Sequence, residues 1–520
     1  MAGARSILRG TLLPVRISGL AEFGRRRTRD RRLALAAAAA LFGVALALRV
    51  PFRTALAYHW DGAEFALAVR EFNVALSQPH APGYFLYVML GRWVHTVVAD
   101  PHAALVWVSV VAGSLLVPVM YGLGAALFDR RTGWVAALLA LTSPQLWFHS
   151  EVALTYVVDA LLVCLTMWWC WQSWARGGRW MDAVGLGALL AVTGGVRPQT
   201  VPALLPVVLF TAWHWDRPRF AKLLVTGATA VVLALAWLWP TVQWSGGWEL
   251  YREVVRRHTA FNVSATFAGG GWGALGWNIF LVVLFTANGL MLATGLLVGG
   301  VLYRDWITLD RRQVQLLGWW LVPMLAFGTV FGFTKQPGYV LSYLPALLLL
   351  AAAAAGQLRG LVFTGVVGVV CLVNVTAFAV WDDGLLTTAR TAAKLRDHDA
   401  RLAGAVAAVR ARFDPAETVV LHAGEYLDYG RVQFQWHLSE FFHLQLAPDP
   451  TLVTPPGRPL VAAQDGRTVF VTGLAAAGHR RRLLVVPPRR TLDIFQPYLG
   501  PVTARPVAGS GGLVFEVTGP

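Results

Sequence analysis

Long stretches of this chain carry no charged side chain, and this feature constrains its fold more than any other. Crossing roughly 30 Å of hydrocarbon takes about 20 apolar residues in a helix. About eleven such stretches follow one another along the chain. They lie near residues 33–50, 103–127, 133–149, 152–174, 183–197, 199–214, 222–243, 275–303, 314–333, 339–356 and 360–381. The pattern predicts a polytopic α-helical membrane protein.

The composition supports the same class. Of the 520 residues, 56% are hydrophobic and 14% are charged, whereas soluble proteins carry roughly 25% charged residues. Cys164, Cys170 and Cys371 all lie inside apolar stretches, which argues against a disulfide framework or a cysteine metal site.

Two apolar segments need a separate interpretation. Residues 183–214 form one run that is too long for a single span, and Gly194-Gly195-Val196-Arg197-Pro198 favours a break within it. Residues 84–99 are apolar but short, with Arg92 and His95 in the middle. We interpret this segment as an interfacial helix that lies on the membrane.

Basic residues predict the orientation. The net charge is +16, which in a soluble protein would suggest a nucleic-acid partner. In a membrane protein it sets topology, because cytoplasmic loops are enriched in Arg and Lys. Residues 1–32 hold nine arginines, and every loop predicted to lie inside is basic. We therefore expect a membrane protein with its N-terminus on the cytoplasmic side, in contact with membrane lipid and with no nucleic-acid partner.

Three regions follow from this pattern. Residues 1–32 form a basic cytoplasmic segment, and residues 33–384 form a transmembrane core with a long first outer loop at 51–102. In residues 385–520 charges return, and short β-branched runs such as Thr418–Leu421 alternate with helix-like segments. Two helices are expected there, Thr388–Phe413 and Val432–Leu446. This composition predicts a small extracytoplasmic α/β domain.

Two acidic residues lie just beyond the first span. Asp61 and Glu64 are three positions apart in His59-Trp60-Asp61-Gly62-Ala63-Glu64-Phe65, so they share one face of a helix. Carboxylates near a bilayer are costly and are functional candidates. Such a pair can act as a general base or bind a metal. The alternative is a solvated loop helix with ordinary capping carboxylates.

Other polar residues are expected on the same leaflet. Cations at this depth suit a phosphate at the lipid headgroup level, although snorkelling toward the headgroups is the alternative for Arg197 and Lys335. Tyr339 is a further candidate for binding the donor phosphate. The candidates for substrate binding are His80, Tyr84, Glu151, Tyr156, Arg256 and His258. His80 and His149 are also weak candidates for a metal site, and the loop interpretation is preferred for both.

Two sequence motifs resemble a known family. Asp61-Gly62-Ala63-Glu64-Phe65, followed by Pro79-His80-Ala81-Pro82-Gly83-Tyr84, is similar to the first-loop signature of bacterial protein O-mannosyltransferase-like proteins of the GT-C class. In this chain Ala81 and Phe85 replace two prolines of that signature. The segments Gly-Gly-Val-Arg-Pro-Gln (194–199) and Lys-Gln-Pro-Gly-Tyr (335–339) also resemble GT-C features. The resemblance covers roughly residues 33–380.

The resemblance implies a hexosyltransferase that uses a polyprenyl-phosphate-linked sugar, mannose being the expected one. Asp61 would be the general base and Glu64 would support it, while Arg197, Lys335 and Tyr339 would bind the donor phosphate. The acceptor would be a hydroxyl of an exported protein, on Ser or Thr, and the displacement would be inverting. The resemblance also implies a location in the bacterial cytoplasmic (inner) membrane. No nucleotide-binding fingerprint occurs. No cofactor is assigned with certainty, and a divalent metal is kept as an alternative.

Other functions stay open from the sequence alone. One alternative is a glycosyltransferase whose acceptor is a glycolipid or a cell-wall glycan. A transporter or flippase is a different class. Transport paths need polar groups at the midplane, but few ionisable residues lie deep in the predicted spans, Asp159 being the main one. An assembly or receptor protein that works through its outer domain is a third class.

Overall fold

The computed structural model describes most of the chain. The described residues are 17–302, 307–332, 336–381, 391–422, 429–446, 453, 455–458, 460–478, 480, 482–486 and 502–518. The helices are α1 (Ile17–Arg49), α2 (Trp60–Arg70), α3 (Phe85–His95), α4 (Pro101–Leu127), α5 (Arg130–Thr142), α6 (Pro144–Ser150), α7 (Tyr156–Ala175), α8 (Trp180–Val196), α9 (Val201–Trp213), α10 (Arg219–Trp244), α11 (Trp248–Val263), α12 (Phe267–Leu290), α13 (Ala293–Leu302), α14 (Arg311–Val330), α15 (Leu344–Gly356), α16 (Gly360–Ala379), α17 (Ala392–Arg412) and α18 (Arg431–His437).

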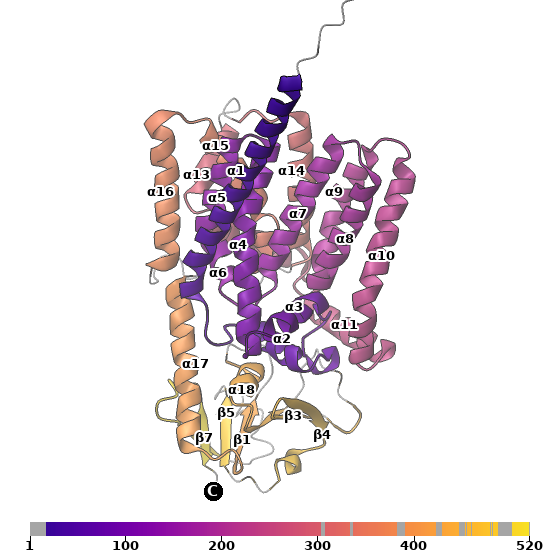
Figure 1. The fold of residues 1–520 in the computed structure, drawn as a ribbon. Coiled ribbons are helices and arrows are strands. Elements are labelled where there is room, and N and C mark those ends of the chain that lie inside the picture. The colour runs from indigo at the N-terminus through magenta and orange to yellow at the C-terminus, as the bar shows by residue number, and fades with distance from the viewer. Residues whose placement is uncertain are drawn as a thin grey trace, which may run out of the picture.

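The apolar stretches form a helical bundle, as predicted (Figure 1). Among the described residues, six helices are long and apolar enough to cross a membrane, judged by length and composition. Of the other predicted spans, 152–174 corresponds to the 20-residue helix α7, and the rest are shorter helices or a consecutive pair. One span expected at 133–149 is divided into α5 and α6 at Pro144, and the run at 183–214 ends its first helix at Val196, before Arg197 and Pro198.

Close packing between α4 and α5 depends on two glycines. A methyl group on Gly133 would lie 2.6 Å from the carbonyl oxygen of Tyr121, and one on Gly124 would lie 2.9 Å from the Cα of Gly133. Both distances are shorter than a real contact, so only glycine permits this approach. Small residues serve helix association in membranes in the same way, because they let backbones come close together.

Three helices lie between the bundle and the C-terminal domain. Figure 1 shows α2, α3 and α11 at the end of the bundle that faces the C-terminal sheet. The segment predicted to be an interfacial helix, residues 84–99, contains α3. The candidate site is built at this end of the bundle.

The C-terminal region forms a seven-stranded mixed sheet with the order β4-β3-β2-β1-β5-β7-β6. Its strands are β1 (Thr418–His422), β2 (Phe442–Leu446), β3 (Leu460–Gln464), β4 (Arg467–Val471), β5 (Arg482–Val486), β6 (Thr503–Pro506) and β7 (Phe515–Thr518). The central strand β1 is parallel to both β2 and β5, and the other pairings are antiparallel. The predicted α/β character is confirmed.

One predicted element of this domain is wrong. The helix expected over Val432–Leu446 ends at His437, and Phe442–Leu446 is strand β2. Two pairings determine this outcome: Leu444 is opposite Leu421 of β1 on one side and Ala462 of β3 on the other. Burial between two strands overrides a local helical preference.

The bundle and the C-terminal domain share a hydrophobic core. Ala392 and Leu395 of α17, with Val432 and Trp436 of α18, belong to the same cluster of buried side chains as the bundle helices. The rest of the domain has two smaller clusters of its own. The C-terminal domain is therefore packed directly against the end of the bundle that carries α2.

Candidate active site

The two predicted carboxylates lie on the first turns of α2. His59 caps this helix, because its Nδ1 accepts a hydrogen bond of 3.2 Å from the backbone N–H of Asp61. Asp61 is in the first turn, where the helix dipole favours a negative charge. Glu64 follows one turn later and is buried, with 2% of its surface exposed.

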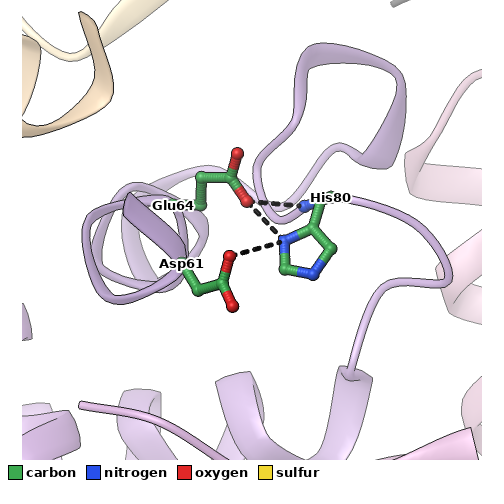
Figure 2. Close-up of side chains that lie close together, drawn as sticks. All are labelled: Asp61, Glu64 and His80. Atoms are coloured by element: carbon green, nitrogen blue, oxygen red, sulfur yellow. Dashed lines mark hydrogen bonds and ion pairs between the residues drawn. The ribbon is translucent and has the colours of Figure 1, made fainter. Parts of the chain in front are cut away.

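His80 joins the two carboxylates, as Figure 2 shows. Its Nδ1 lies 2.5 Å from Oε2 of Glu64 and 3.8 Å from Oδ1 of Asp61. The backbone N–H of His80 also donates a hydrogen bond of 3.3 Å to Oε2 of Glu64. The expected pair is thus a three-membered cluster of Asp61, Glu64 and His80.

Local turns place His80 opposite α2. The backbone N–H of Gln78 donates to the carbonyl of Asn73, and the N–H of Asn73 donates to the carbonyl of Gln78. Gly83, whose N–H bonds to the carbonyl of His80, has φ of 113°. A side chain at Gly83 would be strained by that backbone and would also come within 3.0 Å of Thr241.

The pKa values of the two carboxyl groups in this cluster shift in opposite directions. Burial raises the pKa of Glu64. Burial also opposes ionisation of Asp61, but the nearby His59 and His80 outweigh it and hold the Asp61 pKa below its usual range. Burial lowers the pKa of His80, and the two carboxylates overcome this effect and raise it to about 9. At neutral pH the cluster therefore holds an ionised Asp61 beside a protonated His80.

Arg197 is held where α8 ends, between two aromatic rings. Its guanidinium lies 4.2 Å from the ring centre of Tyr156 and 4.4 Å from that of Tyr339. Nη1 donates a hydrogen bond of 2.8 Å to Oγ1 of Thr155, and Nε lies 4.0 Å from Oδ2 of Asp159. The second terminal nitrogen, Nη2, is buried and has no hydrogen-bond partner among the described residues.

A cavity of about 250 Å³ opens onto the carboxylates. Its lining comes from five parts of the chain: the first loop with α2, the start of α7, the segment between α8 and α9, α11, and the segment after α14. The lining residues are His59, Trp60, Asp61, Glu64, His80, Tyr84, Tyr156, Gln199, His258, Phe261, Asn262, Gly332, Gln336 and Tyr339. A second cavity of about 20 Å³ is lined by Arg197 and Asp159 and shares Gln199 and Tyr339 with the first.

The structure brings most of the predicted site residues together. Tyr84, Tyr156, His258 and Tyr339 line the larger cavity with the cluster, and the His258 ring stacks on that of His80 at 5.7 Å. Arg197 contacts this group through the rings of Tyr156 and Tyr339.

Three predicted residues are placed differently. Glu151 is buried away from the cavity lining and interacts electrostatically with Arg49 at the end of α1. Arg256 is exposed on α11, and its guanidinium makes two hydrogen bonds of 2.7 Å to Glu253. Lys335 lies outside the described residues, and Gly332 and Gln336, which flank its segment, line the cavity.

Sequence reasoning did not single out several lining residues. His59 caps α2, and its Nε2 lies 2.8 Å from Nε2 of Gln336. Gln199 donates a hydrogen bond of 2.8 Å to the Tyr84 hydroxyl. Both glutamines belong to motifs that the sequence contains, Arg-Pro-Gln and Lys-Gln-Pro, so their adjacency to Arg197 and Lys335 is the signal that could have found them.

Asp61, Glu64 and His80 have the donor set of a metal site. One ligand atom from each residue lies within 4.8 Å of the other two. Two carboxylates and an imidazole suit a divalent ion such as Zn²⁺ or Mn²⁺. A metal would occupy the position of the His80 proton, because the same Nδ1 cannot hold both.

Comparisons with known proteins agree with this architecture. Residues 80–244 match the family model described as dolichyl-phosphate-mannose-protein mannosyltransferase. No curated protein matches the sequence significantly. The crystal structure of ArnT from Cupriavidus metallidurans in the apo state is similar, with a TM-score of 0.57 and 14% identity over 95% of this chain and 98% of that chain. ArnT from the same organism bound to undecaprenyl phosphate gives 0.57 and 13%, over 94% and 98%.

The likeness to ArnT shows that the chain has a GT-C fold along nearly its whole length. Together with the match of residues 80–244, it confirms the resemblance that the first-loop motif indicates. The chain thus has the fold of GT-C membrane glycosyltransferases, and residues 80–244 are similar to the mannosyltransferase family model.

Proposed function

We propose that this protein transfers a single sugar, mannose, from a polyprenyl-phosphate donor to a hydroxyl acceptor with inversion at the anomeric carbon. One observation carries the proposal: an ionised carboxylate, Asp61, and a buried guanidinium, Arg197, lie at adjoining cavities that share Gln199 and Tyr339. A base and a cation on either side of one small space are what a direct displacement needs. The undecaprenyl phosphate bound to the similar ArnT supports a lipid-linked donor.

The nucleophilic half of the reaction belongs to Asp61. The carboxylate accepts the proton of the acceptor hydroxyl as the acceptor oxygen forms its bond to the anomeric carbon. Asp61 is 17% exposed within the cavity lining, so an acceptor can reach it. His80 and Glu64 do not need to exchange protons in this step, because their ion pair holds the imidazolium beside Asp61 and keeps that carboxylate ionised.

The leaving-group half belongs to Arg197. The bond between the anomeric carbon and the phosphate oxygen breaks, and the phosphate takes the electron pair. Arg197 has a free Nη2 among the described residues and is immobilised by Tyr156 and Tyr339. A preorganised cation stabilises charge that develops in the transition state without having to reorganise. We extend this role to Lys335 on the basis of its motif, Lys-Gln-Pro-Gly-Tyr.

We further propose that the acceptor is Ser or Thr of an exported protein and that the site faces the outside of the inner membrane. The matching family model describes a protein mannosyltransferase, and the basic N-terminal segment favours a cytoplasmic start. A glycolipid or cell-wall glycan would use the same base and the same donor. The identity of the acceptor is therefore decided by the product of the reaction.

Replacing Asp61 with Asn tests the proposed chemistry. Membranes containing Asp61→Asn protein receive labelled polyprenyl-phosphate mannose, and we expect transfer to fall by about 10²–10⁴-fold, which is the usual contribution of a general base. Asp397→Asn is the matched control, because Asp397 is exposed on α17. Near-normal transfer by a well-expressed Asp61→Asn protein would overturn the assignment.

Mass spectrometry of exported proteins tests the acceptor. Cells with and without the gene are compared for hexose on Ser and Thr. Loss of hexose in the deleted strain, restored by the wild-type chain but not by Asp61→Asn, supports a protein acceptor. Unchanged protein glycosylation together with a missing hexose in the lipid or cell-wall fraction would move the acceptor to a glycan. Flux of the donor across proteoliposomes without a covalent product would favour a transporter.

A further inference from the structure

The C-terminal domain contacts the backbone immediately before the candidate base. Asp399 of α17 accepts hydrogen bonds from the N–H groups of Ala55, at 2.7 Å, and Leu56, at 3.3 Å. Gln433 of α18 donates to the carbonyl of Ala57 at 3.0 Å. His437 accepts the N–H of Ala57 at 3.2 Å through its Nε2. Four backbone groups of this segment are thus bonded to a domain that begins more than 300 positions later in the chain.

A second connection reaches the other side of the cluster. Oγ1 of Thr468, on strand β4, accepts a hydrogen bond of 2.6 Å from the side-chain amide of Gln78 and one of 2.9 Å from that of Gln435. Gln435 in turn accepts a hydrogen bond of 2.6 Å from Arg431. All four side chains are buried, with exposed fractions of 6% or less.

These two connections enclose the histidines that surround Asp61. His59 follows Ala57 by two residues and caps α2, and His80 follows Gln78 by two residues and contacts both carboxylates. Oε1 of Gln78 has no hydrogen-bond partner among the described residues, so its amide is held through Nε2 and Thr468. A buried hydrogen bond of this kind is hard to break, because breaking it leaves a desolvated group without a partner. The positions of both histidines therefore depend on side chains of the C-terminal domain.

We propose that Thr468 and Gln435 are positioning residues of the glycosyl transfer: acting through Gln78, they fix His80 against Asp61 and Glu64. The catalytic consequence rests on the function proposed above. Neither residue lines the cavity, so neither touches the substrates there. Reacting groups must be placed to well within about 1 Å, because a displacement of about 1 Å lowers the rate by up to about 10²-fold.

A positioning role and a merely structural one differ in what they change. If Thr468 only stabilises the domain, its loss lowers the melting temperature and the amount of active protein, and the remaining molecules work normally. If it positions His80, the folded protein binds its donor as before but turns over slowly. The donor-binding cation, Arg197, is held by Thr155, Tyr156 and Tyr339, which lie outside this network.

The experiment compares full-length variants purified in nanodiscs. Thr468→Val removes the hydroxyl and keeps the shape, Thr468→Ser restores the hydroxyl, and Thr472→Val is the control at an exposed threonine four residues along. With polyprenyl-phosphate mannose as the donor, we expect Thr468→Val to lower kcat by about 10- to 100-fold with an unchanged donor KM. Hydrogen exchange in residues 73–82 should become faster. Thr468→Ser and Thr472→Val should behave like the wild type.

A double-mutant cycle identifies the link itself. Gln78→Leu removes the amide on the other side of the same hydrogen bond, so Gln78→Leu and Thr468→Val should not be additive in kcat or in exchange. Additive effects would overturn the proposal. It would also be overturned by wild-type exchange and kcat in Thr468→Val, or by a lower melting temperature as the sole change.

Hydrogen exchange separates this proposal from the proposed function. If the wild-type protein transfers no mannose, the function is wrong, yet faster exchange in residues 73–82 of Thr468→Val would still support the link between the C-terminal domain and the His80 segment. If transfer is normal and Thr468→Val leaves exchange unchanged, the function stands and the positioning role is overturned.

Discussion

The guanidinium of Arg197 lies over the Tyr339 ring, 4.4 Å from its centre. The Tyr156 ring lies at a similar distance from the same group. A planar cation between aromatic rings is stabilised by their negative faces and cannot rotate away. Arginine is suited to this position and lysine is not, because an ammonium group is compact and cannot stack or form a bidentate contact.

Arg197→Lys should therefore impair donor binding even though it preserves the charge. We expect kcat/KM for polyprenyl-phosphate mannose to fall by about 10- to 100-fold, which corresponds to about 1.4–2.8 kcal/mol. Steady-state kinetics in detergent or nanodiscs measure this. Arg252→Lys, at an exposed residue of α11, is the control. Equal kinetics for the two variants would contradict a role of Arg197 at the phosphate.

The pH profile should have an alkaline limb near pH 9. Asp61 and Glu64 raise the pKa of His80 to about 9, so the imidazolium loses its proton as the pH rises through this value. The site then loses a positive charge that favours an anionic donor, and kcat/KM should fall. By linkage, the stability that protonated His80 contributes is complete below its unfolded pKa of about 6.5 and is lost as the pH rises through about 9.

His80→Gln is the matched variant for this profile. A neutral amide keeps a polar side chain at the position but cannot titrate, so the limb near pH 9 should disappear and kcat/KM at pH 7.5 should be lower than in the wild type. Rate measurements from pH 6 to 10 check both effects. An unchanged alkaline limb in His80→Gln would assign it to another group.

Glu151 should matter for stability more than for substrate binding. It is buried and interacts electrostatically with the buried Arg49, and removing the charge that compensates a buried cation costs up to about 3–5 kcal/mol. Glu151→Gln should lower the thermal unfolding temperature and leave the donor KM unchanged. Glu440→Gln, in a partly exposed pair with Arg410, should cost about 1 kcal/mol or less. A raised KM with normal stability would instead support the substrate contact that its sequence position suggests.

Cysteine labelling tests the predicted orientation. Thr472 in the C-terminal domain and Arg217 between α9 and α10 are both exposed. We expect a membrane-impermeant thiol reagent to label Thr472→Cys in intact cells with an opened outer membrane, and Arg217→Cys after permeabilisation alone. The unmodified chain is the control, since Cys164 and Cys170 are buried. The opposite labelling pattern would place the site in the cytoplasm.

The sequence predicts the bundle well because lipid imposes a simple requirement on it. Each apolar stretch must form helix to satisfy its backbone, so the runs that contain α4 or α10 could be located from composition alone. The C-terminal domain is different. Strand β3, Leu460–Gln464, contains two alanines, which have low strand propensity, and its identity depends on pairing with β2 and β4.

The same distinction applies to the site. Asp61 and Glu64 are visible in the sequence because a charge beside an apolar span is costly, and His80 is visible through its motif. The contribution of Thr468 is not, because it arises from a contact between residues 390 positions apart. No spacing or periodicity encodes such a contact. Long-range polar links of this kind are found from the three-dimensional arrangement.

The volume of the cavity has a consequence for when the reaction can occur. At about 250 Å³ it is smaller than the roughly 300–1,000 Å³ typical of sites for drug-sized ligands. A side-chain hydroxyl on a rigid, folded surface would bring too much neighbouring structure to enter beside a sugar. If the acceptor is a polypeptide, as proposed, it must arrive as an extended segment. Glycosylation would then compete in time with the folding of its own substrate, and slow-folding regions would be modified most completely.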